Sequence, residues 1–322
     1  MIETRLTRAF ALDHPVISAP MARAAGGKLA AAVTRAGGLG LIGGAYCDAE
    51  WIEAQFGEAG NEAVGCGLIT WALADRPGVL EQVLARKPRA IFLSFGNPAQ
   101  FAGQIAEAGV PLICQVQTLR DARQAADLGA AVIVAQGAEA GGHGESRATM
   151  TLVPEAADML ARAHPGTLLV AAGGIADGRG LAAALMLGAD GVLMGSRLWA
   201  SDEALVSTAM QAAAVRAGGD DTIRSTVMDV ARRLNWPGRY TCRVLKNAFT
   251  DRWHGRVDAL LAAAETVAPA WVAGWEAGDP VASNTFVGEA AGLIDAVRPA
   301  GEIVQGIVAE AEVLLGGGWR RV

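Results

Sequence analysis

The chain has 322 residues, of which 52% are hydrophobic and 19% are charged, and its formal net charge is −6 at pH 7. This length fits one large domain, or a barrel with an added lobe, because a (β/α)8 barrel typically needs about 250 residues. No basic stripe with interleaved aromatic residues occurs, so nucleic acid is not expected as a partner.

Short apolar runs separated by polar or glycine-rich turns predict the strands. Each run is apolar nearly throughout, which is typical of parallel strands buried on both faces. In chain order they span residues 15–21, 39–43, 64–69, 90–95, 111–116, 131–136, 168–172 and 191–195.

Helical patterns lie between these strands, at residues 28–36, 98–108, 118–128 and 177–187. Several carry start or stop signals, such as Thr118 as an N-cap. Strands that alternate with helices predict βαβ units, and eight such units indicate an α/β fold of the closed (β/α)8 TIM-barrel type. A doubly wound open sheet is the alternative.

The pattern changes after residue 202. Residues 203–217 and 257–268 are predicted to be helices with no clear strand between them, and residues 300–315 predict a last helix. We therefore predict a barrel over residues 1–202, an inserted helical lobe over the barrel mouth at 203–298, and a C-terminal helix that packs back on the barrel at 299–322. The basic pairs Arg232–Arg233 and Arg320–Arg321 are predicted to be solvated.

Cysteine spacing and hydropathy exclude further classes of site. The four cysteines are far apart and form no C-x-x-C pair, so no metal site or redox dithiol is predicted. The N-terminal residues lack a long apolar segment, and no run of about 18 apolar residues was found. We expect a soluble cytoplasmic protein with no membrane partner, and a homodimer is left open.

Glycines follow the last two predicted strands. Gly173 and Gly174 come after one strand, and Met194, Gly195 and Ser196 end the next. Barrels often bind phosphate with these two loops, because exposed backbone N–H groups and a serine hydroxyl can donate to the anion. The alternative is that these glycines only form tight turns, but two such sites at matched strand ends favour phosphate binding.

A histidine between glycines follows the sixth predicted strand. The segment 136–144 reads QGAEAGGHG, and it places His143 at the end of the barrel where catalytic groups lie. Histidine suits a general base because its pKa lies near neutrality. His143 could instead be a loop residue that caps a helix. The other histidines, His14, His164 and His254, lie in turns or in the lobe.

The end of the first predicted strand reads Ala19–Pro20–Met21. Met21 could belong to the core, or this segment could face a planar ring, and spacing alone leaves both open.

Together these segments resemble the nitronate monooxygenase family, formerly called 2-nitropropane dioxygenases. The resemblance covers nearly the whole chain and implies a (β/α)8 barrel with a helical lobe and a non-covalently bound FMN. It rests on residues 15–21, 36–40, 136–144, 171–175, 188–197 and 288–294.

The resemblance also implies roles for individual residues. His143 would take the α-proton from a nitroalkane, and the nitronate would then be oxidised with O2 to a carbonyl compound and nitrite. The cofactor-binding candidates are Ala19, Pro20 and Met21 against the isoalloxazine ring, Gln136, Gly141 and Gly142 at the flavin, and Gly173, Gly174, Leu193, Met194, Gly195 and Ser196 around the phosphate.

One position departs from the family pattern. Many members have an asparagine after the third strand that reaches the flavin, whereas Gly67 takes that place here. Glycine has no side-chain amide, so we hypothesise that Gln117, at the end of the fifth strand, supplies one instead.

Other functions remain open. An FMN-dependent NAD(P)H reductase of enoyl thioesters or quinones shares the same motifs and is the main alternative. A barrel similar to inosine monophosphate dehydrogenase would need a catalytic cysteine after strand six, and none lies between Cys114 and Cys242. A flavin carrier without activity is a further alternative, which His143 at the mouth argues against.

Overall fold

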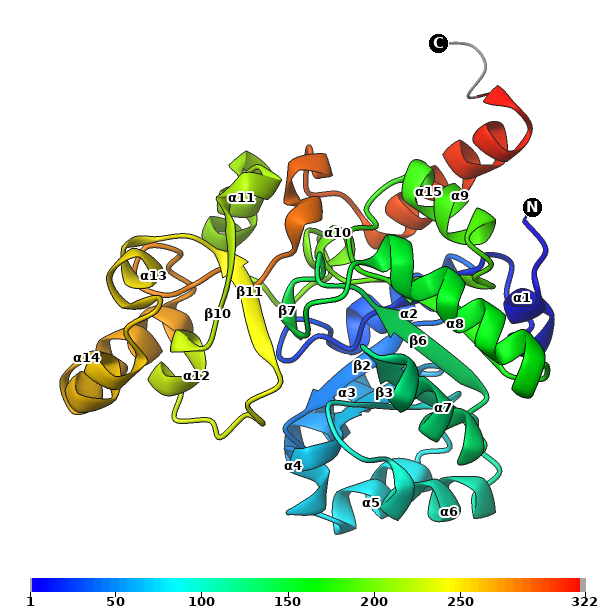
Figure 1. Cartoon of the computed structure of the whole chain (residues 1–322), viewed down its shortest axis with the longest axis horizontal. Coiled ribbons are helices and arrows are strands. Elements are labelled where there is room, and N and C mark those ends of the chain that lie inside the picture. Colours follow the sequence, from blue (N-terminus) through cyan, green and yellow to red (C-terminus); the bar gives the residue numbers. More distant parts are fainter. Residues whose placement is uncertain (1, 319–322) are drawn as a thin grey trace.

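The computed structural model describes residues 2–318, and Arg320 and Arg321 lie outside this range. All eight predicted strands form, in one parallel sheet (Figure 1). Its strands are β1 (Val16–Ser18), β2 (Leu41–Ala45), β3 (Gly65–Ile69), β4 (Ile91–Ser94), β5 (Leu112–Val116), β6 (Val132–Gln136), β8 (Leu168–Ala172) and β9 (Gly191–Met194).

The strand order confirms the predicted barrel. The order is β1-β9-β8-β6-β5-β4-β3-β2, and every neighbouring pair is parallel. The two ends of this series meet, because Ile17 bridges Leu39 just before β2 and Ser18 N donates to Leu39 O at 3.0 Å. This ring excludes the doubly wound open sheet.

Helices cover the outside of the ring, the predicted N-cap Thr118 is present, and Asp177 caps a second helix in the same way. Thr118 Oγ1 accepts from Asp121 N at 3.1 Å, and Asp177 Oδ1 accepts from Gly180 N at 3.1 Å. The helices of the barrel are α1 (Arg5–Phe10), α2 (Gly27–Arg35), α3 (Ala49–Ala59), α4 (Thr70–Ala74), α5 (Gly78–Ala85), α6 (Ala99–Glu107), α7 (Leu119–Asp127), α8 (Thr149–Ala163), α9 (Gly178–Met186) and α10 (Ser196–Trp199).

The barrel interior is filled by apolar side chains. Ile17, Phe92 and Val134 meet inside the ring, and Leu6 and Phe10 of α1 belong to the same cluster. A second, larger cluster lies between the strands and the surrounding helices. Because the interior is packed, an open site can lie only at a mouth of the barrel.

The lobe contains strands, which the sequence analysis missed. Residues 222–225 and 241–245 form β10 (Thr222–Ser225) and β11 (Thr241–Leu245), which pair antiparallel, and β11 also pairs with β7 (Gly142–Gly144). Figure 1 shows this small sheet between the barrel and the lobe helices. These strands are short and carry arginines, and their pairing with β7 is distant in sequence, so no local apolar pattern marks them. The predicted limits 1–202, 203–298 and 299–322 stay predictions.

The lobe helices differ from prediction at their ends. α11 begins only at residue 208, after a turn, and α14 runs on past residue 268 through Pro269. Pro269 and Glu265 are both exposed, so water can hydrate the carbonyl that loses its partner. The remaining elements are α11 (Thr208–Arg216), η1 (Gly219–Asp221), α12 (Val227–Ala231), α13 (Ala248–Trp253), α14 (Val257–Ala277) and η2 (Glu289–Leu293).

Within the described chain, α14 is long and apolar enough to cross a membrane by length and composition, with a mean hydropathy of 1.2 and 22% of its most apolar window buried. In the sequence, Asp258 and Glu265 interrupt the apolar run of this helix, so no membrane span was predicted there. Core helices of soluble proteins meet the same two criteria, so α14 by itself does not indicate a membrane. Leu260 and Trp271 of α14 are buried within the lobe.

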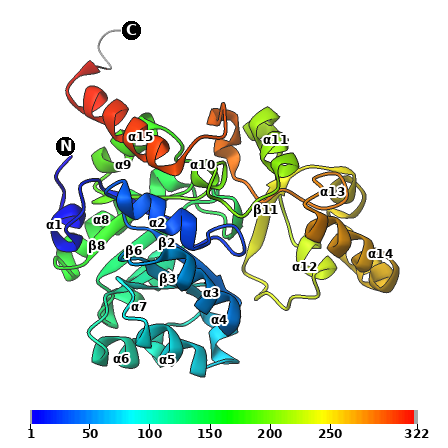
Figure 2. The same cartoon turned by 180° about the vertical axis from the view of Figure 1, so that it is seen from behind.

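The last helix, α15 (Ala300–Leu315), spans the predicted residues. It packs against α9 and α2 on the outside of the barrel, as Figure 2 shows from behind. The chain therefore returns to the barrel after the lobe.

Candidate active site

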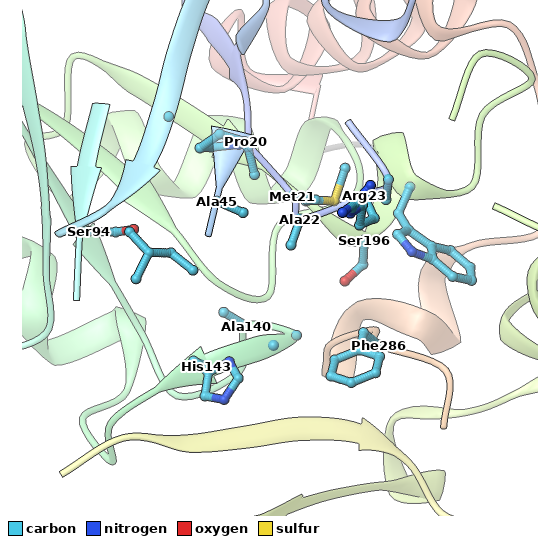
Figure 3. Close-up of a pocket in the computed structure, with 18 of the residues that line it drawn as sticks. Pro20, Met21, Ala22, Arg23, Ala45, Ser94, Ala140, His143, Ser196 and Phe286 are labelled. Carbon is cyan, nitrogen blue, oxygen red and sulfur yellow. The ribbon is translucent and has the colours of Figure 1, made fainter. Parts of the chain in front are cut away.

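A cavity of about 790 Å³ lies at the carboxyl ends of the barrel strands, and residues of the lobe complete its lining. Figure 3 shows Pro20, Met21 and Ala22 on one side of it and Ala140 and His143 on the other. The predicted site residues that line it are Ala19, Pro20, Met21, Gln136, Gly141, Gly142, His143, Gly173, Gly174, Leu193, Gly195 and Ser196.

Two predicted residues, Met194 and Gln117, do not line the cavity. Successive side chains of a strand point to opposite faces, so Leu193 faces the barrel interior while Met194 packs in the core outside the ring. Gln117 is 2% exposed, and its Nε2 donates to Gln136 Oε1 at 2.7 Å. Its amide is therefore held by Gln136 rather than presented to the cavity.

Gln115 reaches the cavity instead, and its Nε2 donates to the same Gln136 oxygen at 3.1 Å. Two amides thus converge on Gln136 Oε1 and fix the orientation of that side chain. The Nε2 group of Gln136 remains free to donate to a bound ligand.

The structure leaves room only for glycine at position 67. A Cβ atom at Gly67 would lie 2.3 Å from Cβ of Pro20 and 2.4 Å from its Cγ. The Pro20 ring therefore packs directly over the backbone of β3, and no side chain fits between them. This part of the cavity lining is therefore a close apolar contact with no side-chain amide.

The part of the cavity lined by Gly173, Gly174, Gly195 and Ser196 has the features of an anion site. Gly173 and Gly174 have φ of +101° and +75°, values that favour glycine. Within residues 2–318 the N–H groups of Gly174 and Gly195 make no hydrogen bond. Ser196 Oγ accepts from Gly288 N at 2.8 Å, so its hydroxyl proton is directed elsewhere. These unpaired donors could bind an anionic group such as a phosphate.

His143 lies on β7, is 8% exposed, and lines the cavity. Its Nε2 is 3.0 Å from both carboxylate oxygens of Asp229. A carboxylate only accepts hydrogen bonds, so Nε2 carries the proton and Nδ1 carries the lone pair. Nδ1 makes no hydrogen bond to the described residues and, unlike the sealed Nδ1 of His14, keeps access to the cavity.

Burial is the main influence on the pKa of His143 and lowers it, while Asp229 raises it and Arg232 and Arg224 lower it. The net shift is downward from the ordinary value near 6.5. His143 is therefore neutral at neutral pH, which is the state that can accept a proton.

Sequence reasoning missed Asp229, and it predicted Arg232 wrongly as a solvated residue. Arg232 Nη2 lies 2.7 Å from Asp229 Oδ1, and the guanidinium sits 5.1 Å from the centroid of the Phe286 ring. The spacing of three residues on a helix could have indicated the Asp229–Arg232 pair. Its contact with His143, 86 residues earlier, has no local signal.

Aromatic side chains close the cavity beside His143. Trp236 stacks on the imidazole with ring centroids 3.4 Å apart and an interplanar angle of 4°. Phe95 contacts both rings edge-on. This wall restrains the imidazole and excludes water from one of its faces.

Comparisons with known proteins agree with this architecture. Residues 67–310 match the family model described as nitronate monooxygenase. A nitronate monooxygenase of Metarhizium robertsii is 36% identical, with 93% of this chain and 91% of that protein covered. An octahydroindene carboxyl-CoA dehydrogenase of Mycobacterium tuberculosis is 32% identical over 71% of this chain and 64% of that protein. FabK from Thermotoga maritima has a similar structure, with a TM-score of 0.87, 28% identity and full coverage of both chains.

Proposed function

Because the chain belongs to the nitronate monooxygenase family, we propose that this oxidoreductase uses FMN and O2 to convert alkyl nitronates, formed from nitroalkanes, into carbonyl compounds and nitrite. The observation that carries the proposal is His143, whose Nε2 is bound to Asp229 while Nδ1 is open to the cavity.

The residues present fit FMN. Pro20 and Met21 would lie against the ring system, Gln136 and Gln115 would supply amides, and Ser196 with its neighbouring glycines would bind the phosphate. When bound, FMN would supply the electron acceptor for the substrate and the route of electrons to O2.

His143 would act on a nitroalkane as a general base. The α C–H bond breaks, the proton moves to Nδ1, and the electron pair enters the nitro group to give the nitronate. Asp229 accepts from Nε2 throughout and stabilises the imidazolium that forms, while Arg232 balances the charge of Asp229. The stacked Trp236 keeps the ring in position during the transfer.

The main alternative is an FMN-dependent reductase that takes electrons from NADH or NADPH. It is favoured by the M. tuberculosis relative, which is named as a dehydrogenase of a coenzyme A thioester. The cavity also extends along apolar lobe residues such as Leu205, Val206 and Trp275, which could accommodate a larger substrate. An inert flavin carrier has no need of the His143–Asp229 pair.

The first test mixes the anaerobic holoenzyme with NADH, NADPH and propyl-2-nitronate in turn and follows the visible absorbance of the flavin. Bleaching by the nitronate, with no response to either nicotinamide, is expected. Rapid bleaching by a nicotinamide would favour the reductase instead, and a protein that takes up no FMN would contradict both.

The second test replaces the base. His143→Asn should slow oxidation of neutral nitroalkanes about 10²–10⁴-fold while sparing pre-formed nitronates, which have already lost the proton. His254→Asn is the matched control, because His254 lies outside the cavity and contacts Ser225. Equal losses on nitroalkane and nitronate would remove His143 from this role.

A further inference from the structure

Tyr46 follows β2 directly and lines the same cavity as His143. Its hydroxyl oxygen is 3.4 Å from Arg232 Nη1 and 3.3 Å from Trp236 Nε1. Guanidinium and indole N–H groups are donors only, so the phenol oxygen is the acceptor in both contacts. These two long hydrogen bonds occupy both acceptor positions of the oxygen.

The hydroxyl proton of Tyr46 is left without a partner, since Tyr46 donates no hydrogen bond to any residue of the range 2–318. A half-buried donor that stays unpaired costs free energy, and a ligand acceptor would recover it. Burial raises the pKa of Tyr46, although the charge of Arg232 opposes this. The phenol therefore stays protonated and remains a donor at neutral pH.

The same lobe residues position Tyr46 and His143. Trp236 stacks on His143 and meets Tyr46 edge-on, with ring centroids 6.3 Å apart. Arg232 joins Asp229, the partner of His143, to the Tyr46 hydroxyl. The proton acceptor and the free proton donor therefore face one cavity and depend on one set of supports.

We propose that Tyr46 donates a hydrogen bond to the substrate oxygen that is conjugated with the carbon deprotonated by His143. This inference rests on the proposed function. As the α C–H bond breaks, the electron pair moves onto the nitro oxygens, and the hydrogen bond from Tyr46 strengthens because its acceptor becomes an anion. In a reductase the same donor would polarise the carbonyl of an enoyl thioester or quinone.

Binding of two inert probes to the holoenzyme tests the proposal without turnover. 2-Methyl-2-nitropropane has a nitro group but no α-hydrogen, and pivalate carries an anionic oxygen pair of similar size. Measured by isothermal titration calorimetry, Tyr46→Phe should lower the affinity for the neutral probe about 3–10-fold and the affinity for the anion about 10–100-fold, because hydrogen bonds to charged groups are stronger. FMN content should be unchanged, since Phe keeps the ring.

Tyr240→Phe is the matched control. Tyr240 is the other tyrosine of the chain, and it packs edge-on against Phe95 and Trp236 without lining the cavity. The affinities of the Tyr240→Phe variant for both probes should stay within about twofold of the wild-type values, a smaller change than the loss of a hydrogen bond would cause. Incorporating 3-fluorotyrosine at Tyr46 keeps the packing and makes the phenol a stronger donor, so pivalate should bind more tightly.

Equal affinities in wild type and Tyr46→Phe, an equal loss in Tyr240→Phe, or a wild-type holoenzyme that binds neither probe would overturn the role of Tyr46. Because neither probe is oxidised, a Tyr46-dependent affinity stands even if nitronates are not substrates. Conversely, nitroalkane oxidation that is intact in Tyr46→Phe refutes only the role of Tyr46.

Discussion

Gly67→Ala should displace Pro20, which lines the cavity directly over Gly67. The added Cβ would lie 2.3 Å from Cβ of Pro20, whereas carbon atoms in contact prefer about 3.5–4.0 Å. Pro20 would have to retreat by the difference, about 1.2–1.7 Å. Its ring cannot rotate away, and hydrogen bonds from Ala19 N to Met194 O and from Met21 N to Ala19 O, both 2.9 Å, restrain its segment.

Forcing an extra methyl group into a packed core typically costs about 1–3 kcal/mol. The melting temperature of the apo-protein should therefore fall by about 2–6 °C, at about 2 °C per kcal/mol for a chain of this size. FMN affinity, measured by fluorescence titration, should fall as well, about tenfold for each 1.4 kcal/mol lost from binding. Gly67→Asn should melt no higher than Gly67→Ala, because its Cβ meets the same Pro20 ring.

Gly103→Ala is the matched control, because nothing lies within 4 Å of the added Cβ in α6. It should raise stability by about 0.5–1 kcal/mol, as alanine replaces glycine inside a helix. If Gly67→Ala melts no lower than the wild type and binds FMN equally well, the close contact with Pro20 does not constrain the cavity lining.

Three further substitutions probe the polar groups of the site. Asp229→Asn removes the carboxylate that raises the pKa of His143, so the pKa of His143 should fall further below 6.5. The acidic limb of the pH profile of kcat/KM for nitroalkanes should therefore move to lower pH. The plateau value of kcat/KM should drop about 10–100-fold, because the base is weaker and its tautomer is no longer fixed. An unmoved limb in a stopped-flow pH series would contradict the pairing. Gln115→Ala should shift the visible spectrum of bound FMN and lower the affinity for FMN about tenfold, which is the value of one hydrogen bond. Gln117→Ala should act only through Gln136 and lower the affinity for FMN less. Equal effects in a titration would restore Gln117 to the flavin site.

The barrel could be predicted from sequence because its information is local. Strands such as β6 and β8 are buried on both faces and therefore read as continuous apolar runs. β10 and β11 could not be predicted in this way. They carry Arg224 and Arg243, whose half-buried guanidinium groups both donate to the Ala138 carbonyl, and a charged residue within so short a segment hides the apolar pattern of a strand.

The candidate site divides along the same line. Gly173, Gly174 and His143, which line the cavity, could be picked out from the sequence because glycine and histidine stand out beside a strand end. Asp229 and Tyr46 were missed because their roles arise from contacts between segments far apart in the chain. Only the pairing of β7 with β11 brings these segments together, and no periodicity in the sequence encodes that pairing.

β7 is hydrogen-bonded to the lobe strand β11, so the backbone at His143 is tied to the lobe as well as to β6, which ends six residues before β7 begins. A displacement of the lobe away from the barrel would therefore also move His143 away from Pro20 and Met21, on the opposite side of the cavity (Figure 3). Under the proposed function, proton abstraction by His143 would therefore depend on the lobe lying against the barrel as it does in this structure.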